Sequence, residues 1–241
     1  MTAPDPSPLQ VIAMHGWSGE ASHWEPWRQV FDRQGWTWQS GERGYGGAAP
    51  RWPLWQPQGL RVVIAHSLGP HLLPATVLAT AEAVVLLASF GRFVPPGPAG
   101  RRLRQALTTM ERQLDHPETA SAMLHSFLVQ AAAPEPVTLL PPGPADRLLG
   151  EAERLRLRED LQLLGRCRGL PPGFPHGIPV LAVEAADDHI VVPEARELLR
   201  RDLEASRAQL HWLSLSGAGH CLLQPGVLAP VLAWLQTLLA P

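Results

Sequence analysis

The chain has 241 residues, of which 45% are hydrophobic, and a formal net charge of −2. It is therefore long enough to bury a substantial core, and its overall charge gives no indication of a nucleic-acid partner. Its two cysteines lie far apart in the sequence, so they form neither a disulfide framework nor a metal-binding spacing.

The first part of the chain contains no targeting signal that we recognise. Residues 1–10 are polar and proline-rich, without the basic and apolar regions of a signal peptide. No segment reaches the roughly 18 consecutive apolar residues expected of a membrane span. We therefore expect a cytoplasmic, monomeric protein with no membrane span, no metal site and no other cofactor.

The chain begins with an alternation of predicted strands and helices. Residues 9–14 form a short apolar run that leads into a glycine-containing loop, residues 15–19. A helix is predicted over residues 24–34, a strand over 36–39 and a flexible turn over 41–47. Seven of the nine tryptophans precede residue 56, and we interpret most of them as core residues.

A serine follows the next predicted strand. The β-branched run at residues 62–65 stops at His66-Ser67-Leu68-Gly69, and an apolar segment that predicts a helix over 72–80 comes next. A strand, a sharp turn and a helix expose a serine at the tip of the turn, as in the pattern G-x-S-x-G. Here Ala65 replaces the first glycine, a small residue for another small residue.

The middle of the chain departs from this alternation. After a predicted strand at residues 83–88, residues 92–176 read as an all-helical insertion, with amphipathic helices near 103–114, 120–131 and 145–164. This insertion carries 11 arginines against nine acidic residues, which favours it as the face for an anionic partner.

The alternation resumes after the insertion. Strands are predicted at residues 180–183 and 210–215, and helices at 193–203 and 226–239. Acidic residues follow the first of these strands, and a histidine follows the second. The sequence therefore predicts an α/β fold with a mostly parallel sheet, whose core (residues 1–91 and 177–241) carries a helical cap (residues 92–176).

The order serine, acid, histidine, together with several short motifs, resembles the α/β-hydrolases. The motifs are His15-Gly16-Trp17, similar to the family's oxyanion loop; residues 41–46, similar to its acid-x-Arg-Gly-x-Gly turn; residues 65–69, similar to its nucleophile elbow; residues 179–191, similar to its acid segment with Ala185 in place of glycine; and residues 217–220, similar to its histidine loop. These motifs run in family order over most of the chain.

The resemblance implies a role for each of five residues. Ser67 is the predicted nucleophile, His220 its general base and Asp188 the acid that orients the histidine. Asp187 stays as the alternative acid, because the choice depends on counting from Ala185. The backbone N–H groups of Trp17 and Leu68 are the predicted oxyanion donors.

Within this fold, a serine nucleophile argues against dehalogenases and the usual epoxide hydrolases. The strings His15-Gly16-Trp17, Ser67-Leu68-Gly69, Leu87-Ala88-Ser89-Phe90 and residues 126–130 most resemble the carboxylesterases of biotin synthesis. These enzymes demethylate pimeloyl-acyl carrier protein methyl ester. A general short-chain esterase or thioesterase, a C–C bond hydrolase and, in another class, a hydrolase-fold ligand receptor stay as alternatives.

This finer resemblance leads to two groups of predicted contacts. The residues expected to line an apolar acyl tunnel are Trp17, Phe90, Phe127 and Leu128. The residues expected to hold an acidic carrier protein are Arg101, Arg104, Arg112, Arg154 and Arg158. The family's cap arginines before Phe127 are replaced here by His125 and Ser126, so the contact pattern differs from the family's.

Overall fold

The computed structural model describes residues 8–240, so most of the segment that we tested for a signal peptide lies outside the described residues. It contains a six-stranded, fully parallel sheet, in the order β2-β1-β3-β4-β5-β6. The strands are β1 (Leu9–Met14), β2 (Thr37–Ser40), β3 (Leu60–His66), β4 (Ala83–Leu87), β5 (Pro179–Ala185) and β6 (Gln209–Leu215). The predicted α/β fold is confirmed.

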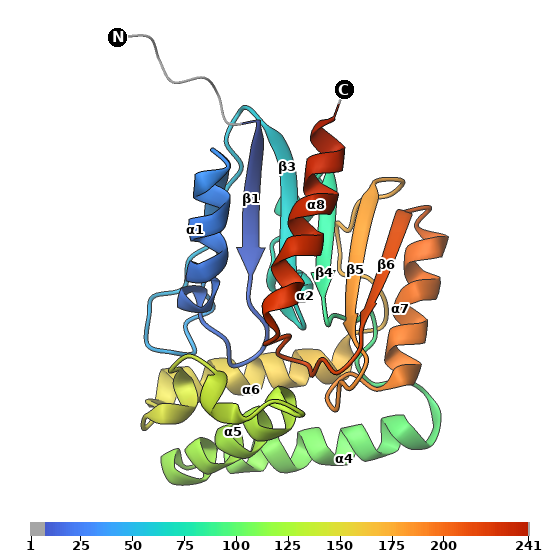
Figure 1. The fold of residues 1–241 in the computed structure, drawn as a ribbon. Coiled ribbons are helices and arrows are strands. Elements are labelled where there is room, and N and C mark those ends of the chain that lie inside the picture. The colour runs from blue at the N-terminus through green and yellow to red at the C-terminus, as the bar shows by residue number, and fades with distance from the viewer. Residues whose placement is uncertain (1–7, 241) are drawn as a thin grey trace.

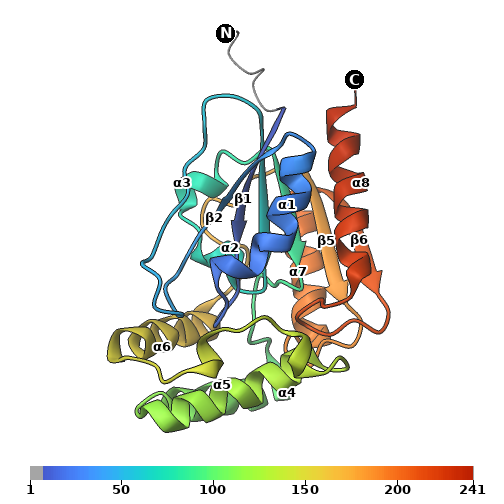
Figure 2. The same ribbon diagram turned by 60° about the vertical axis from the view of Figure 1, so that its left-hand side comes forward.

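Helices cover both faces of the sheet (Figures 1 and 2). Side chains alternate along a strand, so Val62 and Ile64 of β3 pack with α1 (Glu25–Arg33) and α8 (Leu228–Leu239). Val63 and Ala65 point the other way. They pack with α2 (Gly69–Leu72), α3 (Ala75–Leu78) and α7 (Pro193–Ala205).

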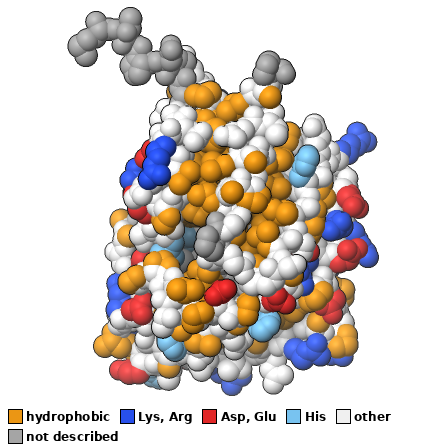
Figure 3. Space-filling view, in the orientation of Figure 1, with side chains coloured by type: hydrophobic (Ala, Val, Ile, Leu, Met, Phe, Trp, Pro, Cys, Tyr) orange, Lys and Arg blue, Asp and Glu red, His pale blue; other side chains and the backbone are white. Residues whose placement is uncertain are grey.

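The α8 side of the molecule carries little charge. No aspartate, glutamate, lysine or arginine follows Arg207 in the sequence. Figure 3 accordingly shows hydrophobic side chains over the middle of this face, with charged side chains mostly toward its margins. Among the described residues, no helix has the length and apolar character needed to cross a membrane.

The predicted helix over residues 72–80 is wrong, because the structure has two short helices there. Leu73 adopts an extended conformation with ψ of 143° between α2 and α3. Proline disfavours the helical conformation in the residue before it, and Pro74 thus ends the first helix.

The segment between β4 and β5 lies across the carboxyl ends of the strands (Figure 1). It contains α4 (Gly97–Gln113), α5 (Pro117–Ala132) and α6 (Glu151–Arg166), with 3₁₀ turns at Val137–Leu139 and Pro144–Asp146. The third helix was predicted to begin at residue 145. It begins at Glu151, where the Glu153 carboxylate accepts the Gly150 N–H and forms the helix start.

Polar contacts fasten α6 to the core loops. The Tyr45 hydroxyl and Arg43 Nε both donate to Asp160 Oδ2, each at 2.6 Å. One turn earlier on α6, the Leu157 carbonyl accepts the Trp17 indole N–H at 2.9 Å. The helix therefore sits in a fixed position above the loop that follows β1.

Candidate active site

Ser67 lies in the sharp turn between β3 and α2. Its φ of 54° is left-handed, a strained conformation for a residue with a side chain. The backbone on both sides is held: the Ser67 N–H donates to the Leu87 carbonyl (2.9 Å), and the Ser67 carbonyl accepts the Ser89 hydroxyl (2.7 Å). These contacts fix the direction in which the Ser67 hydroxyl points.

The turn requires small residues around it. A Cβ on Gly69 would lie 2.5 Å from the Met14 carbonyl oxygen, and a Cβ on Gly16 would lie 2.8 Å from Ser67 Cβ. Ala65, by contrast, fits where the motif has its first glycine, fully buried in the core. The loop after β1 thus packs directly against the serine.

Ser67, His220 and Asp188 form a continuous hydrogen-bonded chain. The Ser67 Oγ lies 2.9 Å from His220 Nε2, and His220 Nδ1 lies 2.8 Å from Asp188 Oδ2. Because a carboxylate only accepts, Nδ1 carries the proton and Nε2 accepts the Ser67 hydroxyl. All three side chains are buried.

The structure places Asp188, and not Asp187, against His220. The second oxygen of Asp188 accepts the N–H groups of Ile190 (2.7 Å) and Val191 (2.9 Å). Burial raises the pKa of Asp188, but the His220 ring and these donors outweigh it and hold the pKa below its ordinary value. Asp187 is exposed.

His66, beside the serine, supports the histidine loop. Burial and the neighbouring His220 lower the pKa of His66 to about 3, so its ring is neutral. Its Nε2–H donates to the His220 carbonyl at 2.9 Å. On the other side of the loop, the Cys221 N–H donates to the Ala131 carbonyl at the end of α5 (3.0 Å). Core and cap thus both hold His220.

The backbone N–H groups of Trp17 and Leu68 are among several near Ser67 for which the described part of the chain shows no hydrogen-bond acceptor. Trp17 lies in the loop after β1, and this loop is braced by His15. The His15 Nδ1–H donates to the Gly16 carbonyl (2.9 Å), and His15 Nε2 accepts the Arg43 N–H (3.2 Å). Trp17 and Leu68 therefore keep their backbone N–H groups available, and their role as oxyanion donors stays a prediction.

Ser67 and His220 open into a cavity of about 590 Å³. Trp17, Phe127 and Leu128 line it as expected, and the Trp17 and Phe127 rings meet edge to face at 5.1 Å. Phe90 does not line it, which corrects that prediction. Its side chain is buried in the core, stacked with His71 and packed on Phe93.

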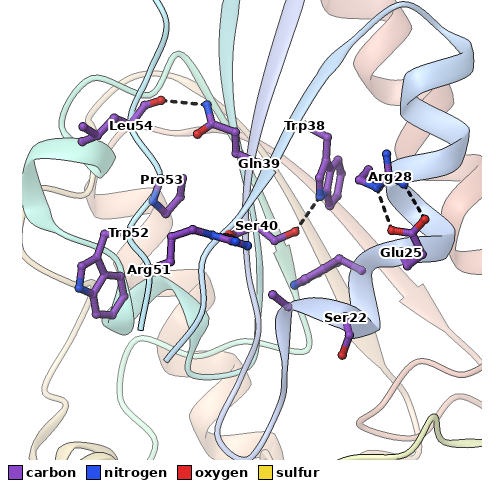
Figure 4. Close-up of a pocket in the computed structure, with 12 residues that line it drawn as sticks. Ser22, Glu25, Arg28, Trp38, Gln39, Ser40, Arg51, Trp52, Pro53 and Leu54 are labelled. Atoms are coloured by element: carbon purple, nitrogen blue, oxygen red, sulfur yellow. Dashed lines mark hydrogen bonds and ion pairs between the residues drawn. The ribbon is translucent and has the colours of Figure 1, made fainter. Parts of the chain in front are cut away.

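A second hollow of about 640 Å³ lies between α1 and the edge strand β2 (Figure 4). Neither Ser67 nor His220 borders it. Its polar side chains bond to one another or to nearby backbone: the Gln39 amide donates to the Leu54 carbonyl, and Arg51 donates to the Ser40 carbonyl. The cavity at Ser67 is therefore the candidate active site.

None of the five predicted carrier-protein arginines lines the cavity at Ser67. Arg101, Arg104 and Arg112 are exposed on α4. The remaining two arginines lie on α6, where Arg154 donates to the Leu149 carbonyl and Arg158 pairs with Asp115. The exposed group on α4 is therefore the part of the prediction that stays available to a partner.

The cysteines and the remaining histidines form no metal-binding group among the described residues. Burial raises the pKa of both Cys167 and Cys221 to about 12, so both stay as thiols. The described residues contain no group of three or more histidine, cysteine or acidic side chains placed to hold a metal.

Several supporting residues were missed from the sequence. Asp160 and Tyr45 anchor the cap, and the Glu42 carboxylate binds the N–H groups of Ala21 and Gly44. A signal existed only for Glu42, the acid of the turn at residues 41–46. Nothing in the sequence connects that turn to a residue 115 positions away.

Comparison with known proteins gives the fold and no more. No protein-family profile and no curated protein sequence matches the chain. Among solved structures, it is similar to an esterase from Thermogutta terrifontis with malate bound (TM-score 0.64, 17% identity, covering 97% of this chain and 92% of that one). It is also similar to an esterase from Exiguobacterium antarcticum (0.63, 15%, 96% and 91%).

A third similar structure is the RedJ thioesterase of prodiginine biosynthesis in Streptomyces coelicolor (TM-score 0.59, 18% identity, covering 98% of this chain and 92% of that one). All three comparisons span nearly the whole chain at low identity. The protein therefore has an α/β-hydrolase fold.

Proposed function

We propose that the protein is a serine hydrolase that cleaves carboxylic esters or thioesters through an acyl-enzyme. The observation that carries this proposal is the hydrogen-bonded chain Ser67–His220–Asp188, whose serine and histidine border a cavity. A serine hydroxyl is a weak nucleophile until a base takes its proton, and His220 Nε2 is in place to do so.

The proposed reaction runs in two steps. Ser67 Oγ attacks the carbonyl carbon while its proton passes to His220, and the resulting oxyanion binds the Trp17 and Leu68 N–H groups. The imidazolium, stabilised by Asp188, then protonates the leaving alcohol or thiol, and the acyl group stays on Ser67. Water, deprotonated by the same histidine, attacks that acyl group and releases the acid.

Hydrolysis of p-nitrophenyl butyrate by Ser67→Ala tests this function. We expect turnover to fall by roughly 10⁶-fold, since the nucleophile of a triad acts as a unit with its base. Ser214→Ala, an exposed serine on β6, is the matched control and keeps full activity. Substantial hydrolysis by the Ser67 variant would overturn the proposal.

We further propose a finer substrate, an acyl methyl ester carried on an acidic carrier protein. It is supported by the sequence strings shared with the biotin-synthesis esterases and by the exposed arginines of α4. Reversing Arg101 and Arg104 to glutamate should weaken activity on a carrier-protein substrate far more than on p-nitrophenyl butyrate. Equal losses on both would remove the carrier protein from the proposal.

Growth of a biotin auxotroph tests whether the methyl ester is the substrate in a cell. A biotin auxotroph lacking its methyl esterase should grow when it carries the wild-type chain, and should not grow with Ser67→Ala. Failure of the wild-type chain to restore growth, with good expression and esterase activity, would reject the methyl ester while leaving the serine hydrolase intact.

A further inference from the structure

The cavity at Ser67 is lined by uncharged and mostly apolar side chains. No aspartate, glutamate or arginine is among the described residues that line it. The side chains that line most of its wall are aliphatic or aromatic: Trp27, Leu128, Leu139, Leu140, Leu223 and Leu228.

Two histidines of the cavity are neutral near pH 7, and both ring nitrogens of a third, His15, are hydrogen-bonded to backbone. His66 has a pKa of about 3, and burial lowers the pKa of His23 below its ordinary value. The His23 Nε2–H donates a hydrogen bond to the Pro142 carbonyl of the cap (3.3 Å). Both ring nitrogens of His220 are hydrogen-bonded, Nε2 to Ser67 and Nδ1 to Asp188.

The charged side chains of the loops around the cavity already have partners, including Glu42, which accepts the N–H groups of Ala21 and Gly44. Arg43 binds Asp160, and Arg147 lies between Glu20 and Glu153 at 3.9 and 3.5 Å. The pairs Arg43–Asp160 and Arg147–Glu20 join the cap to the core, and none of these charged residues borders the cavity. An anionic ligand entering the cavity would therefore lose water without gaining a cation, which is strongly unfavourable.

We propose that the enzyme selects esters whose acyl group is uncharged and apolar, and that it rejects acyl groups ending in a carboxylate. This inference rests on the proposed function and names its substrate class. Each methylene placed against the apolar wall should improve kcat/KM by up to about fourfold, until the cavity is full. The carboxylate product has no cation to hold it there, which favours its release.

Three p-nitrophenyl esters of equal chain length isolate the effect of charge. They are the hexanoate, the adipate mono-ester and the adipate mono-ester whose far carboxyl is methylated. We expect kcat/KM for the anionic adipate to be at least about 100-fold below that for the hexanoate. The methylated adipate, polar but neutral, should lie within about tenfold of the hexanoate.

A charge introduced into the cavity tests the cause. Leu128→Arg places a cation on the cavity wall and should raise the anionic-to-neutral ratio of kcat/KM about tenfold or more. Leu155→Arg makes the same change at an exposed position of α6 outside the cavity, and its ratio should match that of the wild type. Leu223→Arg repeats the test at another residue that lines the cavity if the first variant does not fold.

The outcomes separate this inference from the proposed function. Wild-type hydrolysis of the anionic adipate within threefold of the hexanoate would overturn the selectivity, even with activity that depends on Ser67. An equal shift of the ratio in Leu155→Arg would also overturn it, because the cavity would not be its source. Hydrolysis of the hexanoate that survives Ser67→Ala would instead overturn the function itself.

Discussion

Replacing Asp188 by asparagine perturbs one proton while keeping the shape of the site. In the wild type, Oδ1 accepts two backbone N–H groups and Oδ2 accepts the His220 Nδ1–H. Asparagine must turn its carbonyl oxygen toward the two backbone donors, so its NH₂ group faces His220. The ring must then accept at Nδ1 and carry its proton at Nε2.

That tautomer removes the base, because Nε2 is the atom that lies 2.9 Å from the Ser67 hydroxyl. We expect kcat for p-nitrophenyl butyrate to fall about 10⁴-fold with little change in thermal midpoint. Asp187→Asn, on the adjacent exposed residue, should keep wild-type kcat. If Asp188→Asn keeps more than a tenth of the wild-type kcat, Asp188 does not determine the tautomer of His220.

The remaining predictions concern close packing, cap anchoring and pH. Gly16→Ala brings a methyl group within 2.8 Å of the nucleophile's Cβ and should lower kcat about 100-fold, whereas Gly165→Ala on α6 should not; equal kcat values would contradict this. Asp160→Ala removes the carboxylate from buried Tyr45 and half-buried Arg43 and should cost about 3 kcal/mol of unfolding free energy in urea titrations, against less than about 1 kcal/mol for the exposed Glu159→Ala. The folded-state pKa of His66, about 3, lies below the ordinary 6.5, so protonation favours the unfolded chain between those values. Stability should therefore fall on acidification by up to about 1.4 kcal/mol per pH unit, and His66→Gln should show a shallower slope; identical slopes would reject this contribution.

Local sequence patterns predicted the sheet and the serine turn because those features depend on neighbouring residues. Strand β3 ends at His66, one residue after its apolar run, and Ser67 follows at the tip of the turn. The predicted helix over 72–80 failed for a reason also visible locally, Pro74. Weighing that proline against the apolar run would have divided the helix.

Features that depend on distant contacts were beyond the sequence. Phe90 follows a strand near the site, but its side chain turns into the core against Phe93, and only the packing of the cap decides this. The contact of Arg43 with Asp160 joins residues 117 positions apart. Likewise, the arginine excess of residues 92–176 is real, yet those side chains lie away from the cavity.

If the hydrogen-bonded chain works as we propose, Ser67 is a nucleophile activated by His220. A fluorophosphonate probe, followed by proteolysis and mass spectrometry, tests it most directly because the probe bonds only to an activated hydroxyl. We predict a single adduct on the peptide containing Ser67, which is lost in Ser67→Ala and greatly slowed in His220→Ala. An adduct on another residue, or labelling of Ser67 at an unchanged rate without His220, would contradict the claim.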